Sequence, residues 1–150
     1  GSDLSKYQKV QMGDLVFNKL RTWQGGFGIA QQIGIVSPAY YVFRFDVEKV
    51  MPEYVDLLLK SPLYLAEITR VTKWMPPSQF DTSWDDLKNI QIVLPDLSEQ
   101  RRFVEAYANN PSFLKLDEML NCLSKRIDLL RDSFLTELIL DKQDSARSSC

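Results

Sequence analysis

A short segment of this 150-residue chain, residues 19–24, concentrates side chains that can read DNA bases. Its arginine can donate two hydrogen bonds to O6 and N7 of guanine, its glutamine can bind N6 and N7 of adenine, and its threonine can contact the methyl group of thymine. The glycines at 25 and 26 would let the backbone approach a phosphate. These features predict a DNA-binding loop, and the alternative is a solvated hairpin whose tryptophan folds back on a sheet. The candidate DNA-binding residues are Lys19, Arg21, Thr22, Trp23 and Gln24.

A second polar and aromatic segment lies at 73–81 and carries Lys73, Trp74 and Gln79. The Pro-Pro pair within it excludes a helix or a central strand, so we expect a loop. Its side chains could enter a groove of DNA, and they complete the predicted DNA-binding set. The alternative is a rigid turn whose tryptophan belongs to the core.

The charge distribution matters more than the net charge. The chain has a net charge of −2 and a pI near 5.2, which argues mildly against DNA binding because phosphate contacts require a basic surface. Between positions 6 and 44, however, five basic residues accompany a single acid, and the other acids lie mainly later in the chain. This distribution fits DNA at one end and a protein partner at the other. The basic residues are Lys6, Lys9, Lys19, Arg21 and Arg44, and the acid is Asp14.

The absence of histidine removes the commonest general base and the commonest metal ligand. The two cysteines, Cys122 and Cys150, predict neither a disulfide framework nor a zinc site by themselves. No paired-carboxylate motif is visible. We therefore expect a non-catalytic protein with no cofactor and no metal.

Several short elements would position the two loops. Apolar, aromatic and β-branched residues predict strands at 15–20, 27–29, 33–36 and 39–45, which favours a small, mostly antiparallel sheet. Helices are predicted at 52–60, from Ser61-Pro62 onwards, and at 84–87. The fold class is therefore α/β of the α+β kind, with a small antiparallel-rich sheet and flanking helices.

A strand-to-helix junction follows at 90–102. Ile90, Ile92 and Leu94 alternate with less buried positions as in a strand with one buried face. Pro95 ends that strand because it has no N–H to donate, and Ser98 is the expected cap of the helix that follows.

The last part of the chain predicts a long helix. After an Asn-Asn-Pro break at 109–111, apolar residues recur at alternating spacings of four and three, as a coiled-coil seam requires. A helix packed on its own domain would show the same spacing, and this alternative stays open. The seam residues are Leu116, Leu120, Leu123, Ile127, Leu130 and Phe134.

Three blocks in this order resemble the specificity subunit of type I restriction–modification systems. They are the Gly-Asp-Leu-Val-Phe block at 13–25, the Gly-Ile-Val-Ser-Pro block at 34–44, and the Pro-Asp-Leu-Ser-Glu-Gln junction at 95–100. The resemblance covers residues from about Tyr7 to Lys142. It implies a target-recognition domain at 3–110, a spacer helix at 111–142 that forms an antiparallel coiled coil, and a disordered tail at 143–150. Further strands usually precede the Gly-Asp block in the family, so the resemblance implies either a half-subunit or fragment that lacks the N-terminal part of that domain, or a compact variant of the domain.

The implied function is to read one half of a bipartite DNA target and direct methylation or cleavage by other subunits. The implied partners are double-stranded DNA, the methyltransferase (modification) subunits and the restriction subunit. The last helix would pair with a second half-subunit or with a second copy of the chain. No membrane span is expected, and the cytoplasm is the expected compartment. The alternative function is a dimerisation module that acts through its last helix and has no DNA affinity alone.

Overall fold

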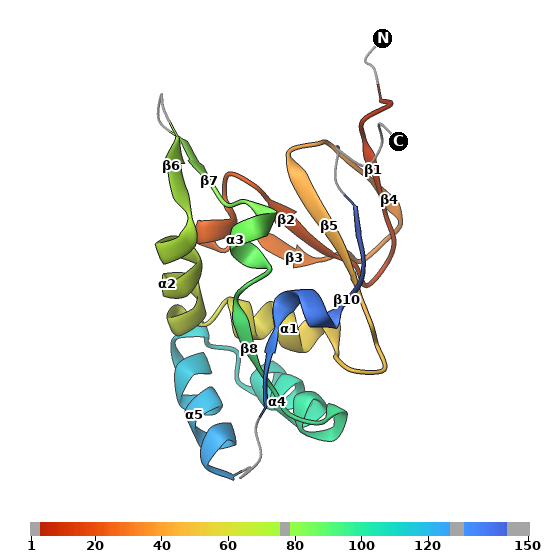
Figure 1. Cartoon of the computed structure of the whole chain (residues 1–150). Helices are drawn as coiled ribbons and strands as arrows, with labels where there is room; N and C mark the ends of the chain where they lie inside the picture. The colour runs from red at the N-terminus through yellow and green to blue at the C-terminus, as the bar shows by residue number, and fades with distance from the viewer. Residues whose placement is uncertain (1–3, 76–78, 127–130, 144–150) are drawn as a thin grey trace.

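The computed structural model describes residues 4–75, 79–126 and 131–143 of the chain. Short strands and helices alternate along the described part (Figure 1). The strands are β1 (Gln8–Val10), β2 (Leu15–Asn18), β3 (Phe27–Ile29), β4 (Gly34–Val36), β5 (Tyr40–Phe45), β6 (Lys73–Met75), β7 (Gln79–Asp81), β8 (Gln91–Leu94), β9 (Arg131–Phe134) and β10 (Ile139–Gln143). The helices are η1 (Thr22–Gln24), α1 (Pro52–Leu59), α2 (Pro62–Val71), α3 (Trp84–Leu87), α4 (Leu97–Asn109), η2 (Phe113–Lys115), α5 (Leu116–Arg126) and η3 (Leu135–Leu138).

The main sheet has the order β10-β5-β2-β3, and all its pairings are antiparallel. Its inward face carries aromatic residues because side chains alternate between the two faces of a strand. Phe17 stacks on Phe27 at 4.8 Å between ring centroids and meets Phe43 at 5.1 Å. Such pairs add about 0.5–1.5 kcal/mol each beyond the area that they bury. The strands predicted at 15–20, 27–29 and 39–45 are confirmed within a residue or two.

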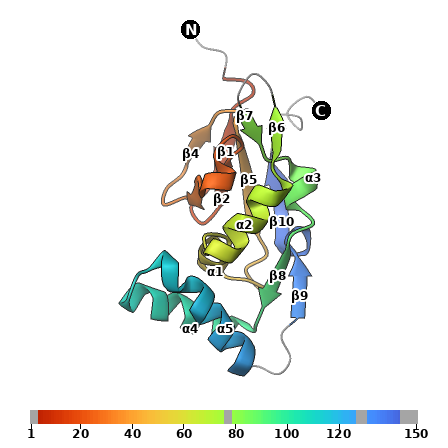
Figure 2. The ribbon, with the colours of Figure 1, turned by 90° about the vertical axis from the view of Figure 1, so that its left-hand side faces the viewer.

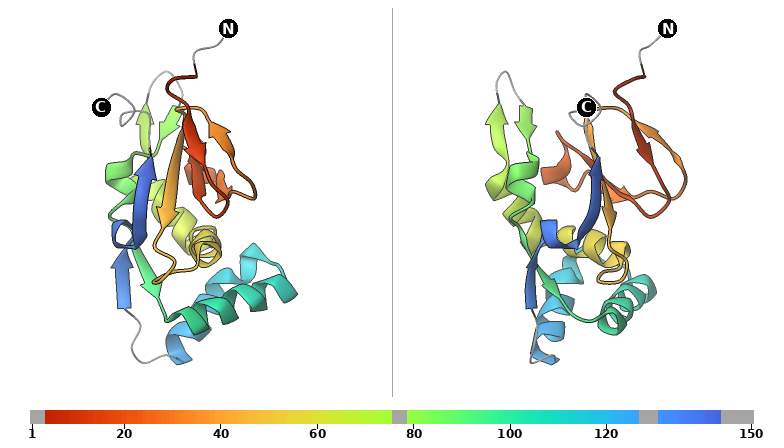
Figure 3. Two further views of the ribbon diagram at one scale, coloured as in Figure 1. Left: turned by 90° about the vertical axis from the view of Figure 1, so that its right-hand side faces the viewer. Right: turned by 45° about the vertical axis from the view of Figure 1, so that its right-hand side comes forward.

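The strand predicted at 33–36 is also confirmed, but it lies outside the main sheet. β4 pairs with β1 in a separate antiparallel ribbon that lies beside β2 and β5 (Figure 3). The side chain of Gln8 joins the ribbon to the main sheet, since its Nε2 donates to the carbonyl oxygens of Ser37 (3.2 Å) and Tyr40 (2.7 Å). Long-range side-chain contacts of this kind leave no pattern in the sequence.

The Gly-Asp pair makes the turn into β2. Gly13 has a φ of 93°, which a residue with a side chain rarely adopts. Asp14 is only 2% exposed and accepts hydrogen bonds from the Gln11 N–H (2.8 Å) and from the Arg44 guanidinium (3.1 and 3.2 Å). The buried carboxylate therefore holds Arg44 in the fold, and Arg44 has a structural role in the basic region.

Helices α1 and α2 each begin with proline in the first turn, as predicted. Two tyrosines on these helices fix β8. The Tyr54 hydroxyl donates to the Val93 carbonyl oxygen (2.7 Å), and the Tyr64 hydroxyl accepts from the Val93 N–H (3.3 Å). Burial raises the pKa of Tyr54 well above its usual range, and the nearby Tyr64 raises this pKa further to a smaller extent. The strand that leads to the Pro95 junction is therefore anchored to both helices.

The junction itself differs from the prediction in one detail. Asp96, and not Ser98, caps α4, because its carboxylate accepts from the Glu99 N–H at 2.9 Å. Gln100 is fully buried and makes three hydrogen bonds across the junction. Its Nε2 donates to the carbonyl oxygens of Pro95 (2.9 Å) and Lys49 (3.1 Å), and its Oε1 accepts from the Met51 N–H (2.8 Å). This side chain connects the exit of β8 to the start of α1.

The C-terminal segment also differs from the prediction. A helix over 111–142 was expected, but α5 ends at Arg126, and β9 and β10 follow it. β9 pairs with β8, and β10 completes the edge of the main sheet beside β5 (Figure 3). The physical reason is that a longer helix competes with strand pairing. Strand pairing buries Leu135 and Leu138 and gives β5 a hydrogen-bonded neighbour over residues 42–45. Gln143 belongs to β10, while the rest of the predicted tail lies outside the described residues.

The fold is a mixed α+β arrangement of small antiparallel sheets with helices, as predicted for its class. Figures 1 and 2 show α4 and α5 at the end of the molecule away from β6 and β7. Among the described residues, no helix combines the length and the apolar character that a membrane span requires.

Candidate nucleic-acid interface

The loop after β2 is braced by its own backbone and by Asn18. The Leu20 N–H donates to Asn18 Oδ1 at 3.0 Å, and the Thr22 hydroxyl donates to the Asn18 carbonyl oxygen at 2.6 Å. An asparagine at the end of a strand commonly organises a turn in this way, which the strand prediction over 15–20 missed. The loop therefore presents its outward side chains from a fixed backbone.

Two glycines close the loop for different reasons. Gly25 ends η1 with a φ of 84° and donates its N–H to the Thr22 carbonyl oxygen. Gly26 passes so close to Arg21 that an added Cβ would lie 2.6 Å from the Arg21 Cβ and 2.7 Å from its carbonyl oxygen. Both glycines are therefore needed for the fold of the loop, whatever it binds.

The structure divides the residues predicted in the first loop. Thr22 is fully buried, so it is not on the surface where a thymine methyl could meet it. Trp23 packs against the core, and its indole N–H donates to the Leu20 carbonyl oxygen (3.1 Å). Thr22 is thus turned inward by its hydrogen bond, and Trp23 is partly buried against the core; DNA contact by the predicted set stays a prediction. Arg21 and Gln24 are exposed and Lys19 is half-buried.

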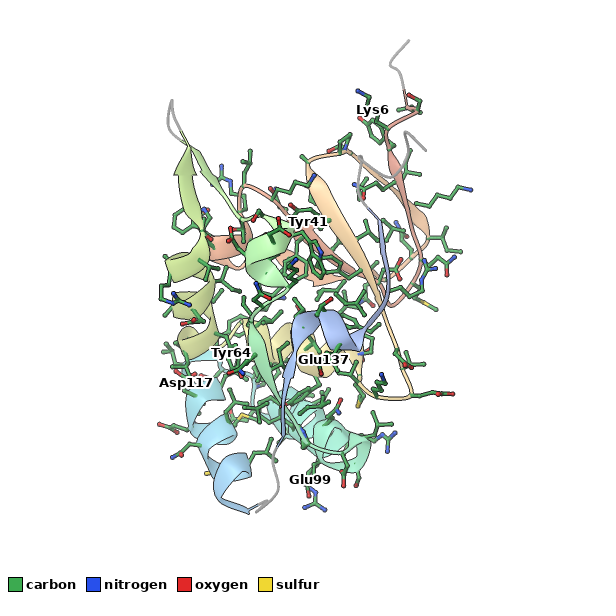
Figure 4. The ribbon with its side chains drawn as sticks, in the orientation of Figure 1. Lys6, Tyr41, Tyr64, Glu99, Asp117 and Glu137 are labelled. Carbon is green, nitrogen blue, oxygen red and sulfur yellow. The ribbon has the colours of Figure 1, made fainter. Side chains whose placement is uncertain are left out.

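The outward residues are also positioned. Arg21 Nη1 donates to Gln24 Oε1 at 3.2 Å, which sets the two side chains side by side. Lys19 Nζ lies 4.6 Å from the centre of the Tyr41 ring, a cation–π distance. The hydroxyl of Tyr41 accepts a hydrogen bond from the backbone N–H of Trp84 at 3.0 Å, and Figure 4 shows Tyr41 between the main sheet and α3. Tyr41 lies in the strand predicted at 39–45, and the strand pattern did not indicate this contact with Lys19 and Trp84.

The second predicted segment forms an antiparallel hairpin, not an irregular loop. Lys73 and Trp74 belong to β6 and Gln79 to β7, and the side chains of these three residues lie outside the described part of the structure. The Pro-Pro pair falls between the two strands, at positions 76–78 that are not described, which explains how strands can flank it.

The two segments lie side by side although some fifty residues separate them in the sequence. The Thr82 N–H, just after β7, donates to the Lys19 carbonyl oxygen at 3.1 Å. The hydroxyls of Thr72 and Thr82 lie 2.7 Å apart at the base of the hairpin, and η1 contacts α2. The two predicted DNA-binding segments are therefore neighbours in the fold, with the loop after β2 beside the base of the β6–β7 hairpin (Figure 1).

The predicted helix seam faces the interior of the chain. Leu116, Leu120 and Leu123 are buried members of the main hydrophobic core. The alternative of a helix packed on its own domain therefore applies to α5. Ile127 and Leu130 lie outside the described residues, and Phe134 belongs to β9, where its backbone pairs with Gln91.

The described residues contain no group of three or more cysteine and acidic side chains placed to hold a metal ion. Comparison with known proteins adds no assignment: no family model matches the chain, and no curated protein matches it. The site is thus defined by its own geometry, as a braced and positively charged loop beside a hairpin.

Proposed function

We propose that the chain recognises DNA sequence as part, or one half, of the specificity subunit of a type I restriction–modification enzyme. It would read one half of a bipartite target through the end formed by η1, β6 and β7. The observation that carries this proposal is the convergence of the two segments. Two polar, aromatic segments that are distant in the sequence lie side by side in the fold. The first of them, residues 19–24, presents Lys19, Arg21 and Gln24.

The chemistry of these three side chains supports sequence-specific contact with bases more than non-specific binding to the DNA backbone. A guanidinium held beside a carboxamide offers in one place the two donors that suit guanine O6 and N7 and the donor and acceptor that suit adenine N7 and N6. The braced backbone lowers the entropy that binding would cost, because the loop is already ordered. The acidic net charge does not oppose this, since phosphate attraction depends on the local surface and salt screens charges beyond about 10 Å.

The chemistry would belong to the partners. We propose that methyltransferase and restriction subunits carry out methylation and cleavage, and that this chain acts without catalysis or a cofactor. In the family an antiparallel pair of spacer helices sets the distance between two half-sites. In this chain any such pairing would have to use the outward side of α5, or follow a rearrangement of 127–143, because the inward leucines are already covered.

A binding assay tests the proposal. The full chain, with and without its methyltransferase partner, would be titrated with duplex DNA at low and moderate salt. Lys19→Ala and Arg21→Ala should each weaken binding by about 1–3 kcal/mol. Arg101→Ala, an exposed arginine on α4 at the other end, should leave binding unchanged. Equal loss in all three variants, or no binding by the assembled complex, would contradict the proposal.

The dimerisation alternative has a separate test. Light scattering across a range of chain concentrations would show whether the chain self-associates. A dimer that binds no DNA, alone or with the methyltransferase, would favour the alternative.

A further inference from the structure

A second feature adjoins the loop: an open groove of about 510 Å³ lined by residues of β2, of β3 and of the loop between them, and by Tyr40 of β5. Asn18, Arg21 and Tyr40 are its polar side chains, and Gly26 and Gly28 contribute backbone. The groove therefore adjoins the proposed base-reading surface, since Arg21 belongs to both and Asn18 braces the loop between them.

Gly28 has no role in the fold that explains a glycine. It lies in the middle of β3, its φ is not positive, and an added Cβ would meet no atom within 4 Å. Glycine in a strand weakens it, because the unfolded chain loses more freedom on folding and there is no side chain to pack. Gly26, two residues earlier, shows the contrast, since any Cβ there would collide with Arg21. Strand glycines mark bulges, bends and places where a ligand or another backbone comes close. Gly34 also has open space at its Cβ, but of the two only Gly28 lines the groove beside the base-reading loop.

The groove offers hydrogen-bond donors and no negative charge. Arg21 uses one of its N–H groups on Gln24 and keeps the rest of its guanidinium. The Oδ1 atom of Asn18 already accepts from Leu20, so its amide group has N–H donors to offer. Tyr40 adds a hydroxyl. None of the residues lining the groove, all within the described chain, is acidic, although the chain as a whole has a net charge of −2. This surface complements an anion with several acceptor oxygens.

We propose that the groove holds the phosphodiester backbone of one strand of duplex DNA, with a phosphate between Arg21 and Tyr40 and the sugar–phosphate chain passing close over Gly28. The inference rests on the proposed function and adds to it the path of the DNA backbone. An open groove continuous with the base-reading loop fits a polymer better than a small anion, which would need a more enclosed site. Phosphate contacts fix the register of a protein on DNA, while base contacts fix the sequence.

Substitutions at two glycines test this path. Gly28→Val would place a branched side chain in the groove, and its Cβ would meet no atom of the described chain within 4 Å. Gly34→Val is the matched control, because Gly34 is also a strand glycine with open space at its Cβ, but it lies on β4 outside the groove. Neither change should lower the thermal midpoint, since valine favours a strand. The full chain would be titrated with a random-sequence duplex and with its preferred duplex at several salt concentrations.

We expect Gly28→Val to weaken binding to both duplexes by about tenfold and to reduce the slope of log K against log salt by about one, the loss of roughly one phosphate contact. Sequence preference should persist, and Gly34→Val should match the wild type. Gly28→Val binding with wild-type affinity and salt slope would overturn the groove assignment alone, provided that Arg21→Ala still weakens binding. A wild-type chain that binds no duplex, alone or with its methyltransferase partner, would overturn the proposed function and this inference together.

Discussion

Replacing Gln100 with alanine should lower the free energy of unfolding far more than is usual for glutamine, which lies mostly on protein surfaces. Its side chain is fully buried and makes hydrogen bonds of 2.8, 2.9 and 3.1 Å to Met51, Pro95 and Lys49. Alanine would leave one N–H and two carbonyl oxygens without these partners. Because Lys49 is exposed, water can replace the bond to its carbonyl oxygen. The other two groups would each cost about 1–3 kcal/mol, so we expect a total loss of about 2–6 kcal/mol.

Urea unfolding measured by circular dichroism would give this free energy, with the slope against urea as a check on two-state behaviour. A loss of this size is a large fraction of the roughly 5–15 kcal/mol by which a domain is usually stable. Gln91→Ala is the matched control, because Gln91 is an exposed glutamine on β8, and its change should stay within about 0.5 kcal/mol. A loss below about 1 kcal/mol for Gln100→Ala, with an unchanged slope, would refute the role of these hydrogen bonds.

Gln100→Glu sharpens the test because it keeps the size of the side chain. A carboxylate can still accept from the Met51 N–H, but it cannot donate to the two carbonyl oxygens and would be repelled by them. Its pKa in the folded chain should therefore be raised, so the ionised form costs stability at neutral pH. The loss should shrink as pH falls through that raised pKa, because the protonated acid can donate one hydrogen bond. A loss that does not change with pH would contradict this account.

Three further predictions concern a cap, a buried acid and the leucine seam. Asp96→Ala should cost about 1 kcal/mol in urea unfolding and Ser98→Ala close to none, and the reverse order would contradict the capping seen here. Burial raises the pKa of the Asp56 carboxyl, so the ionised form costs stability at neutral pH. The free energy of unfolding of the wild type, relative to that of Asp56→Asn, should therefore rise as pH falls through that pKa. A difference between the two free energies that does not change with pH would contradict this explanation. Leu120→Ala should cost about 2–5 kcal/mol and the exposed Leu114→Ala under about 0.5 kcal/mol in the same assay; similar small losses would place the seam outside the core.

Local patterns predicted most of the elements. The alternating Ile90, Ile92 and Leu94 gave β8, and the aromatic run before Phe45 gave β5. Prolines at 52 and 62 marked the first turns of α1 and α2, because their fixed φ suits a helix start. Each of these signals acts over a few residues, so the sequence contains all the information that the element needs.

The candidate site was only partly visible in the sequence. The residue types at 19–24 indicated a polar loop, but not which side chains point outward. Thr22 and Trp23 turn inward because the Asn18 carbonyl oxygen, the Leu20 carbonyl oxygen and the core offer them better partners than water does. The proximity of β6 and β7 to this loop depends on how α2 packs beside η1, which no local pattern records.

By itself, the sequence determined the α+β class, the order of most elements and the presence of a polar loop at 19–24. Only the tertiary structure decided what the apolar seam covers. Spacings of three and four show that one side of a helix is apolar, but they do not say whether a partner or the same chain buries it. Here Leu116, Leu120 and Leu123 face the core. The strands β9 and β10 are more stable paired with β8 and β5 than as a longer helix. Those pairings bury Leu135 and Leu138 and satisfy the hydrogen bonds of two strand edges.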